Sequence, residues 1–232
     1  MDYLTVANEM AKALPPEVAM EVLQARLDKD SGYLPTRLAL AQLQQAAGKF
    51  DLAADSVRPM LNQKEAEGVK PLVLRVLALA AYQSGRFQEA ADDYKTLTDL
   101  VPDDIEALNN LAFILADELK KPADGLSYAE RAVNILKVAP GETVMLNNGN
   151  VYDTYGWVKF RNDDAAGATL ALNHSIESDP SAIAYYHLAL VQKSQGKLEY
   201  AKTSVKQAVQ LATAKKDPIL KKAQDLLAEL SK

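Results

Sequence analysis

Small side chains recur along this chain in two sets of positions, and the step between neighbours is 33 to 44 residues in each set. The first set is Ala7, Ala41, Ala78, Ala112, Gly156 and Ala189, and the second is Ala19, Ala53, Ala90, Gly125, Ala168 and Ala201. A step of this length is typical of solenoids, in which each repeat stacks on its neighbours. Small residues at these positions allow two helices of one repeat to cross closely. The sequence therefore predicts an all-α solenoid of about six helical hairpins.

The composition supports this prediction. The 232 residues include 37 Ala and 33 Leu, which are strong helix formers, against ten Gly and ten Pro. This argues against an all-β fold, and 48% hydrophobic residues argue against disorder. The absence of Cys from the sequence excludes disulfides, thiolate metal sites and Cys nucleophiles.

Glycine and proline mark the boundaries of the helices. Gly48, Gly85 and Gly196 fall between the two helices of a repeat, where a positive φ at the end of a helix suits glycine. Pro102 and Pro180 follow second helices, which they prevent from continuing. Each repeat is therefore expected to be two helices joined by a tight turn.

At these positions the chain resembles the tetratricopeptide repeat family, whose unit has about 34 residues and small side chains at its eighth and twentieth positions. Only two repeats have the proline that usually closes the unit. The resemblance implies one right-handed superhelical domain over residues 1–232. Its repeats are expected near residues 1–33, 34–70, 71–104, 105–148, 149–181 and 182–216.

A last helix is expected at the C-terminal end, over residues 217–231. Asp217 and Pro218 are suited to its N-cap and its first turn. One apolar face then contains Leu220, Ala223, Leu226, Leu227 and Leu230. A solenoid needs such a helix to cover the apolar face of its last repeat.

Two segments lengthen the repeat. Residues 61–71 extend the second repeat, and we expect residues 65–68 to continue a helix before Pro71. Residues 137–150 contain strong turn signals. They favour a loop before a helix that includes Val151, although a small hairpin of residues 144–146 and 151–152 is the alternative.

Catalytic groups are few. The two histidines, His174 and His187, are expected to be polar or partly packed residues on helix surfaces. The acidic pairs at residues 92–93, 103–104 and 163–164 are expected at helix ends or on exposed faces, where acids at a helix start complement its dipole. The sequence contains no nucleophile elbow, phosphate loop, calcium loop or zinc motif. We therefore expect no catalytic site, no metal site and no cofactor.

The resemblance implies a concave surface formed by the first helix of each repeat. It places Gln42, Gln45, Leu79, Asp117 and Leu190 there. It also places there the residues that we expect to contact a peptide, namely Arg75, Tyr82, Asn109, Phe113, Asp153, Trp157, Phe160, Arg161, Tyr186 and Lys193. Aromatic and hydrogen-bonding side chains together are typical of a recognition surface.

Two interpretations of Trp157, the only tryptophan, stay open. It is either the first anchor of a bound peptide or a buried contact between neighbouring first helices. A sharper resemblance fails, because chaperone-binding members use Lys and Asn to bind a C-terminal carboxylate. The corresponding positions here are Leu38 and Gln42, then Arg75 and Leu79.

The charge excludes one class of partner. The net charge is −5, made up of +5 over residues 191–232 and −10 over the rest. A mainly acidic chain is poorly suited to nucleic acid. No apolar run is long enough to span a membrane and no signal segment begins the chain, so both cytoplasm and periplasm are compatible with it.

Two functions are therefore expected as alternatives. The first is a non-catalytic interaction module that binds an extended peptide or a partner helix in the concave groove. The second is a scaffold whose convex or end surface builds a homo-oligomer or a larger complex, with a monomer as the default state. Residues 128–132 and 151–158 also resemble bacterial tetratricopeptide proteins, some of them linked to polysaccharide and protein export. A regulatory fragment of a longer protein is compatible with either function.

Overall fold

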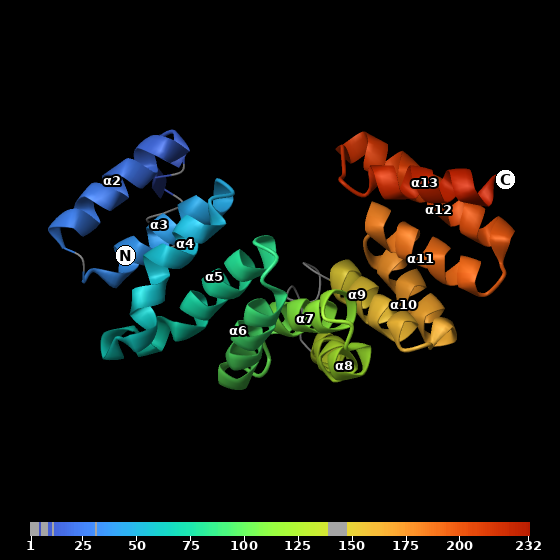
Figure 1. The fold of residues 1–232 in the computed structure, drawn as a ribbon, viewed down its shortest axis with the longest axis horizontal. Coiled ribbons are helices and arrows are strands. Elements are labelled where there is room, and N and C mark those ends of the chain that lie inside the picture. The colour runs from blue at the N-terminus through green and yellow to red at the C-terminus, as the bar shows by residue number, and fades with distance from the viewer. Residues whose placement is uncertain (1–4, 6–8, 11, 31, 139–147) are drawn as a thin grey trace. The chain divides into compact units, whose positions relative to one another are not determined.

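The computed structural model describes residues 5, 9–10, 12–30, 32–138 and 148–232. These residues form twelve α-helices, α2 to α13, and no strand (Figure 1). The prediction of an all-α fold of helical hairpins is confirmed. Ala7 and residues 144–146, half of the alternative hairpin, lie outside the described residues. Val151 lies inside helix α9.

The chain divides into two compact units, residues 1–102 and residues 103–232. We call them the N-terminal unit and the C-terminal unit. The helices of the N-terminal unit are α2 (Pro16–Lys29), α3 (Leu34–Ala46), α4 (Phe50–Val57), α5 (Lys70–Gln83) and α6 (Phe87–Leu100). Within it, α3 pairs with α4 and α5 pairs with α6, while α4 also packs on α5.

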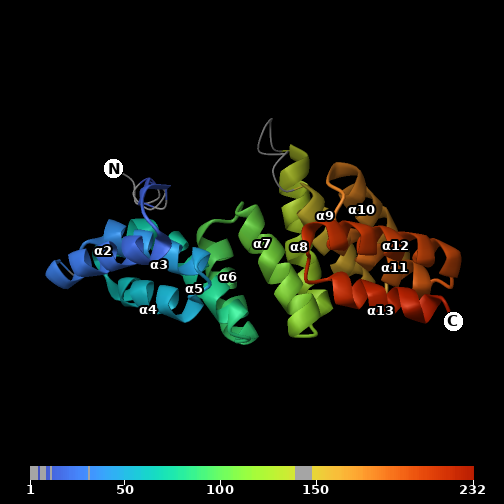
Figure 2. The ribbon, with the colours of Figure 1, turned by 90° about the horizontal axis from the view of Figure 1, so that it is seen from above.

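The C-terminal unit continues the same pattern. Its helices are α7 (Ile105–Phe113), α8 (Pro122–Val138), α9 (Asn148–Arg161), α10 (Ala165–Ser178), α11 (Ala182–Ser194), α12 (Leu198–Lys215) and α13 (Leu220–Leu230). The hairpins are α7 with α8, α9 with α10 and α11 with α12, and α13 lies beside α12 (Figure 2).

The recurring small residues lie where these helices cross. The described alanines of both sets are fully buried. A Cβ atom on Gly125 would lie 2.7 Å from the carbonyl oxygen of Ala112, and one on Gly156 would lie 2.7 Å from Cγ of Leu172. Because those contacts are closer than a real Cβ allows, the two crossings need glycine.

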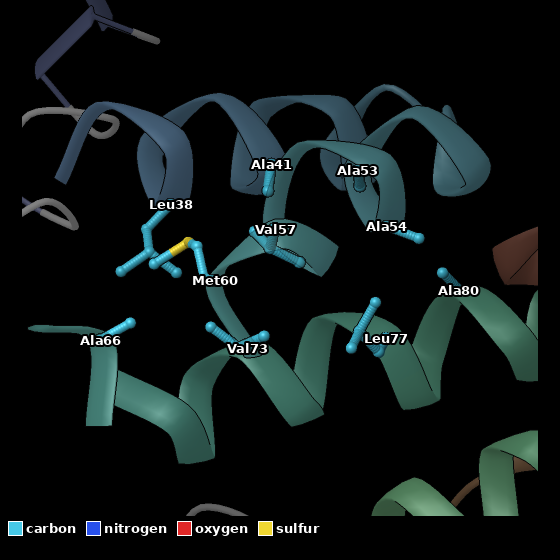
Figure 3. Packing of buried hydrophobic residues seen from close by; sticks show 10 residues of the cluster. All are labelled: Leu38, Ala41, Ala53, Ala54, Val57, Met60, Ala66, Val73, Leu77 and Ala80. Atoms are coloured by element: carbon cyan, nitrogen blue, oxygen red, sulfur yellow. The ribbon is translucent and has the colours of Figure 1, made fainter. Parts of the chain in front are cut away.

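Larger side chains fill the space around these crossings. In the N-terminal unit, Leu38 and Met60 face Val73 and Leu77 of α5 across the interior (Figure 3). Met60 is 1% exposed and Val73 is fully buried. Within this unit, the α3–α4 hairpin thus buries its apolar face against α5, as stacking in a solenoid requires.

The turns inside the repeats have left-handed backbone at three glycines, as expected. The φ angles of Gly48, Gly85 and Gly196 are 72°, 74° and 73°. Lys120 and Asp163 have φ angles of 56° and 63° between the helices of the other two hairpins. Left-handed backbone is sterically unfavourable for a residue other than glycine. Tertiary packing therefore determines the conformation at Lys120 and Asp163.

Two predicted helix boundaries are wrong. Residues 65–68 do not continue an α-helix, because α4 ends at Val57 and two 3₁₀-helices follow, Arg58–Asn62 and Lys64–Val69. Pro59 explains the change, since it has no backbone N–H for an α-helical hydrogen bond.

At the other end, α13 begins at Leu220 rather than at Pro218. The Oδ1 atom of Asp217 accepts a hydrogen bond from the backbone N–H of Ile219 at 2.9 Å. Asp217 therefore stabilises a turn before the helix. Ala223 and Leu226 of α13 are buried against α11 and α12, so this helix covers the last hairpin.

Candidate binding surface on the first helices of the C-terminal unit

Helices α7, α9 and α11 are the first helices of the three hairpins in the C-terminal unit. Helix α9 packs against both α7 and α11. Eight of the ten residues predicted to contact a peptide lie on these three helices. We define the first-helix surface as the side chains of Asn109, Phe113, Asp117, Asp153, Trp157, Phe160, Arg161, Tyr186 and Lys193.

The surface begins at an irregular segment. After Phe113, α7 passes into a π-helix over residues Ile114–Glu118. Such a turn inserts one residue into the helix and changes the direction of the side chains that follow, and it is frequent at functional sites. Asp117 lies in this turn, and its Oδ1 accepts a hydrogen bond from Nε1 of Trp157 at 3.1 Å.

Trp157 lies between its neighbours rather than in solvent, with 8% of its surface exposed. Its ring stacks on His187 of α11, with 4.2 Å between ring centroids and an interplanar angle of 17°. Phe160 lies 5.5 Å away on the same helix, measured between ring centroids. This position matches the interpretation of Trp157 as a buried contact between first helices, and its role as a peptide anchor stays a prediction.

A buried acid–base pair lies beside this stack. Nδ1 of His187 lies 2.9 Å from Oδ1 and 3.1 Å from Oδ2 of Asp153. The two residues are 6% and 7% exposed. Burying a polar group without a partner costs free energy. The hydrogen bond between the imidazole and the carboxylate offsets this cost for both groups. A carboxylate accepts only, so Nδ1 carries the hydrogen.

The expectation for His187 as a surface histidine is therefore wrong. His187 lies on the side of α11 that faces α9. The residues around it in the sequence do not indicate this. The one available signal is that His187 follows Asp153 by 34 residues, about one repeat. His174 is exposed on α10, as expected, with its ring 4.0 Å from that of Tyr152 between centroids.

The rest of the first-helix surface is half-buried. Nη1 of Arg161 lies 3.5 Å from Oδ1 of Asp117, and its guanidinium carbon lies 5.8 Å from the centre of the Trp157 ring. Burial raises the pKa of the Tyr186 hydroxyl. Lys193 pairs with Glu229 of α13 at 2.6 Å.

Asn109 and Phe113 complete the surface on α7. Both are half-buried. Oδ1 of Asn109 is shielded from solvent and has no hydrogen-bond partner among the described residues. An unsatisfied buried acceptor is unusual, and it leaves a group that a partner's N–H could satisfy.

The other two predicted contact residues, Arg75 and Tyr82, belong to the N-terminal unit. Both are half-buried on α5, and the Tyr82 ring lies 5.7 Å from Phe87 between centroids. Nearby on α3, Gln45 donates from Nε2 to the backbone oxygen of Val76 at 3.4 Å.

The acidic pairs have structural contacts. Asp104 caps α7 by accepting from the N–H of Ala107 at 3.0 Å. Asp164 caps α10, and its hydrogen bond with Lys159 holds the pKa of its carboxyl below the ordinary value. For Asp93 the expectation of a helix end or an exposed face is wrong, because it is half-buried in the middle of α6, where burial raises its pKa to about 6. In the described parts of the chain, no three His, Cys, Asp or Glu side chains gather as a metal site would require.

Comparisons with known proteins agree with this architecture. Residues 182–215 match the sequence profile of the tetratricopeptide repeat. No curated protein sequence shows significant similarity to the chain. Among solved structures, a chain of the APC/C hetero-tetramer Cut9–Hcn1 is similar with a TM-score of 0.75 and 16% identity over 99% of this chain. The present chain spans 42% of the length of that relative.

Two smaller structures are similar over nearly their whole length. YrrB, a tetratricopeptide protein with an unusual peptide-binding site, has a TM-score of 0.62 and 15% identity, covering 87% of this chain and 96% of its own. A tetratricopeptide repeat protein from Parabacteroides merdae has a TM-score of 0.57 and 16% identity, covering 99% of both chains.

The repeat pattern, the stacked hairpins and these likenesses define an all-α helical repeat protein. Residues 182–215 match the tetratricopeptide repeat by sequence, and the fold of the whole chain is like that of solved tetratricopeptide repeat proteins. The fold is typical of modules that bind other proteins and is generally non-catalytic. Among the described helices, none combines the length and apolar character needed to cross a membrane.

Proposed function

We propose that the chain is a non-catalytic protein-binding module that holds an extended peptide or a partner helix on the first-helix surface of the C-terminal unit. The observation that carries the proposal is the group of half-buried Phe160, Arg161 and Tyr186 around the rigid Trp157–His187 stack. Arginine and large aromatic residues dominate the binding energy of protein interfaces. Side chains already held in place lose little entropy when a partner binds.

Arg161 is the residue best suited to contact such a partner. A guanidinium has five N–H donors, and among the described residues Arg161 has one ion pair, in which Nη1 lies 3.5 Å from Oδ1 of Asp117. Nearly a third of its side-chain surface is exposed. The unsatisfied donors can therefore bind carbonyl or carboxylate oxygens of a peptide without breaking the existing contact.

The proposal is tested by selecting peptides from a displayed random library on the full chain. The affinity of a selected peptide is then measured by calorimetry. We expect Arg161→Ala to weaken binding at least tenfold, while Tyr200→Ala, on the opposite helix of the last hairpin, leaves it unchanged. Selection of no peptide, or equal affinities of the wild type and the Arg161 variant at equal helicity, would contradict the proposal.

A second candidate function is an assembly scaffold, and a different observation favours it. Leu170, Leu198 and Tyr200 on the second helices α10 and α12 are 73%, 53% and 68% exposed. Large exposed apolar side chains are common at interfaces between proteins. Whether such an assembly belongs to the bacterial envelope or to polysaccharide export stays a prediction.

Light scattering at two concentrations separates these functions. A mass that rises with concentration and falls back in the double variant Leu170→Lys, Tyr200→Lys would favour the scaffold. A constant monomer mass would contradict it.

A further inference from the structure

A cleft of about 460 Å³ lies between α2, α3 and α4 of the N-terminal unit. The first-helix surface belongs to the other unit, so the two share no residue. Its volume is within the range of sites that hold small ligands or single side chains. The lining residues are Gln24, Leu27, Asp28, Arg37, Gln44, Leu52, Asp55 and Ser56.

The second repeat contributes polar side chains to the lining of the cleft. Gln44 accepts a hydrogen bond through Oε1 from the hydroxyl of Ser56 at 2.8 Å. The last repeat has the same pair, Gln192 and Ser204, also at 2.8 Å. The repeats differ seven residues earlier, where Arg37 stands in the second repeat and the last has an aromatic ring.

That aromatic residue is Tyr185, which packs with the apolar cluster of the last hairpin. In the second repeat, Nη1 of Arg37 instead donates to the backbone oxygen of Ser56 at 3.2 Å. The backbone oxygen is neutral, so Arg37 keeps its positive charge, and the charged side chains that line the cleft are this one cation and the two carboxylates of Asp28 and Asp55.

The side-chain amide of Gln44 lines the cleft. Gln44 is 8% exposed, and its Oε1 is already bound to Ser56. Its Nε2 donates to no residue in the part of the chain that the structure describes. This N–H group is not shielded from solvent, so water or the carbonyl oxygen of a bound partner can accept from it.

The walls of the cleft are acidic and partly apolar. Asp55 on α4 is exposed and has no ion pair or hydrogen bond among the described side chains. Within the described residues, Asp28 on α2 accepts a hydrogen bond from the neutral amide of Gln24 at 3.0 Å and from no other group. Leu27 and Leu52, which are 5% and 53% exposed, contribute apolar surface to the same lining.

From these features we propose that the cleft binds a lysine or arginine residue of a partner protein. Its backbone carbonyl accepts from Nε2 of Gln44, and its methylene stem covers Leu27 and Leu52. Its cationic end lies at Asp28 and Asp55. Long basic side chains bury their stems on apolar surface in this way while the charge stays near solvent. This site is independent of the first-helix surface proposed above.

The test is an NMR titration of the full ¹⁵N-labelled chain with N-acetyl-lysine N-methylamide. We expect saturable shifts of backbone amides in α2, α3 and α4, with a dissociation constant in the millimolar range. N-acetyl-norleucine N-methylamide keeps the backbone and stem without the ammonium, and we expect it to bind at least tenfold more weakly. This comparison uses the wild-type chain and does not depend on any variant.

Variants then locate the site. The double variant Asp28→Asn, Asp55→Asn should bind the lysine probe at least tenfold more weakly, whereas Glu21→Gln, an exposed acid of α2 outside the cleft, should bind it as the wild type does. Equal shifts with norleucine, shifts that do not saturate, or unchanged affinity in the double variant would overturn the proposal. Arg161→Ala should leave lysine binding unchanged, which separates this site from the peptide-binding surface.

Discussion

The imidazole of His187 lies face to face with the indole of Trp157, at 4.2 Å between centroids and with 17° between the planes. The stack joins α11 to α9, and the hydrogen bond from Trp157 to Asp117 joins α9 to the π-helical turn after α7. Three successive hairpins of the C-terminal unit are thus connected through one tryptophan. Because solenoid stability is largely a sum over neighbouring repeats, one residue that contacts both neighbours has a large effect.

The first prediction concerns this tryptophan. Trp157→Ala removes a ring that is 8% exposed, together with its stack and its hydrogen bond. Large-to-small substitutions of this kind cost about 3 to 5 kcal/mol, so we expect a loss of about 3 kcal/mol in the free energy of unfolding. Urea unfolding followed by circular dichroism measures it.

Tyr200→Ala is the matched control, because Tyr200 is 68% exposed. We expect that variant to unfold within about 0.5 kcal/mol of the wild type. Equal stability of the two variants would show that the stack contributes nothing to the unit.

The second prediction concerns the close helix crossing at Gly125. A Cβ atom there would lie 2.7 Å from the carbonyl oxygen of Ala112, a backbone atom that cannot rotate away. We expect Gly125→Ala to destabilise the chain by about 1 to 3 kcal/mol, despite the better helix propensity of alanine. Thermal unfolding would show a lower midpoint.

Gly68→Ala is the control for this substitution. No atom lies within 4 Å of a Cβ built at Gly68, and its φ is not positive. We expect its stability to be unchanged or slightly higher, because alanine restricts the unfolded chain. A Gly125 variant as stable as the Gly68 variant would refute the steric argument.

Much of this fold follows from local pattern. Gly125 could be assigned to a helix crossing because its spacing from the other small residues places it where the two helices of one repeat must meet. Gly85 could be assigned a positive φ because it lies between two segments with helical apolar periodicity. These features depend on a single residue and a known spacing. Pro59 also carried a signal, since a helix rarely continues through proline.

The details of the site depend on contacts between repeats and could not be predicted in the same way. The burial of His187 depends on which side of α11 faces α9, and on Asp153 being there to receive its N–H. The π-helical turn that contains Asp117 has no sequence signature. Each is decided by packing between elements that are far apart in sequence.

The third prediction concerns pH. Burial is the main cause that raises the pKa of Asp93 from 3.8 to about 6, and Glu89 adds to it while Arg58 opposes it. Between these two values the folded chain binds more protons at Asp93 than the unfolded chain does. Stability therefore falls as pH rises from about 4 to about 6, and the full cost is present at pH 7.

Asp93→Asn removes this cost. We expect the variant to be more stable than the wild type at pH 7 by about 1 kcal/mol, because solvent screens part of the interaction of a half-buried group. The gain should disappear at pH 4, which urea unfolding at the two pH values measures. Asp99→Asn, on the exposed side of the same helix, should show no such difference, and a pH-independent gain at Asp93 would count against the mechanism.

The fourth prediction concerns the last helix. Leu226 of α13 is 5% exposed and packs with Val205 and Ala208 of α12. Leu226→Asp places a carboxylate among apolar atoms with no partner, so we expect a loss of about 3 kcal/mol or more in the free energy of unfolding. Gln224→Asp adds the same charge on the exposed side of α13 and should have little effect.

If the helix covers the last hairpin, the Leu226 variant should also bind a hydrophobic dye and lose protection from amide exchange first in α11 and α12. Equal behaviour of the two aspartate variants would mean that α13 does not stabilise the array.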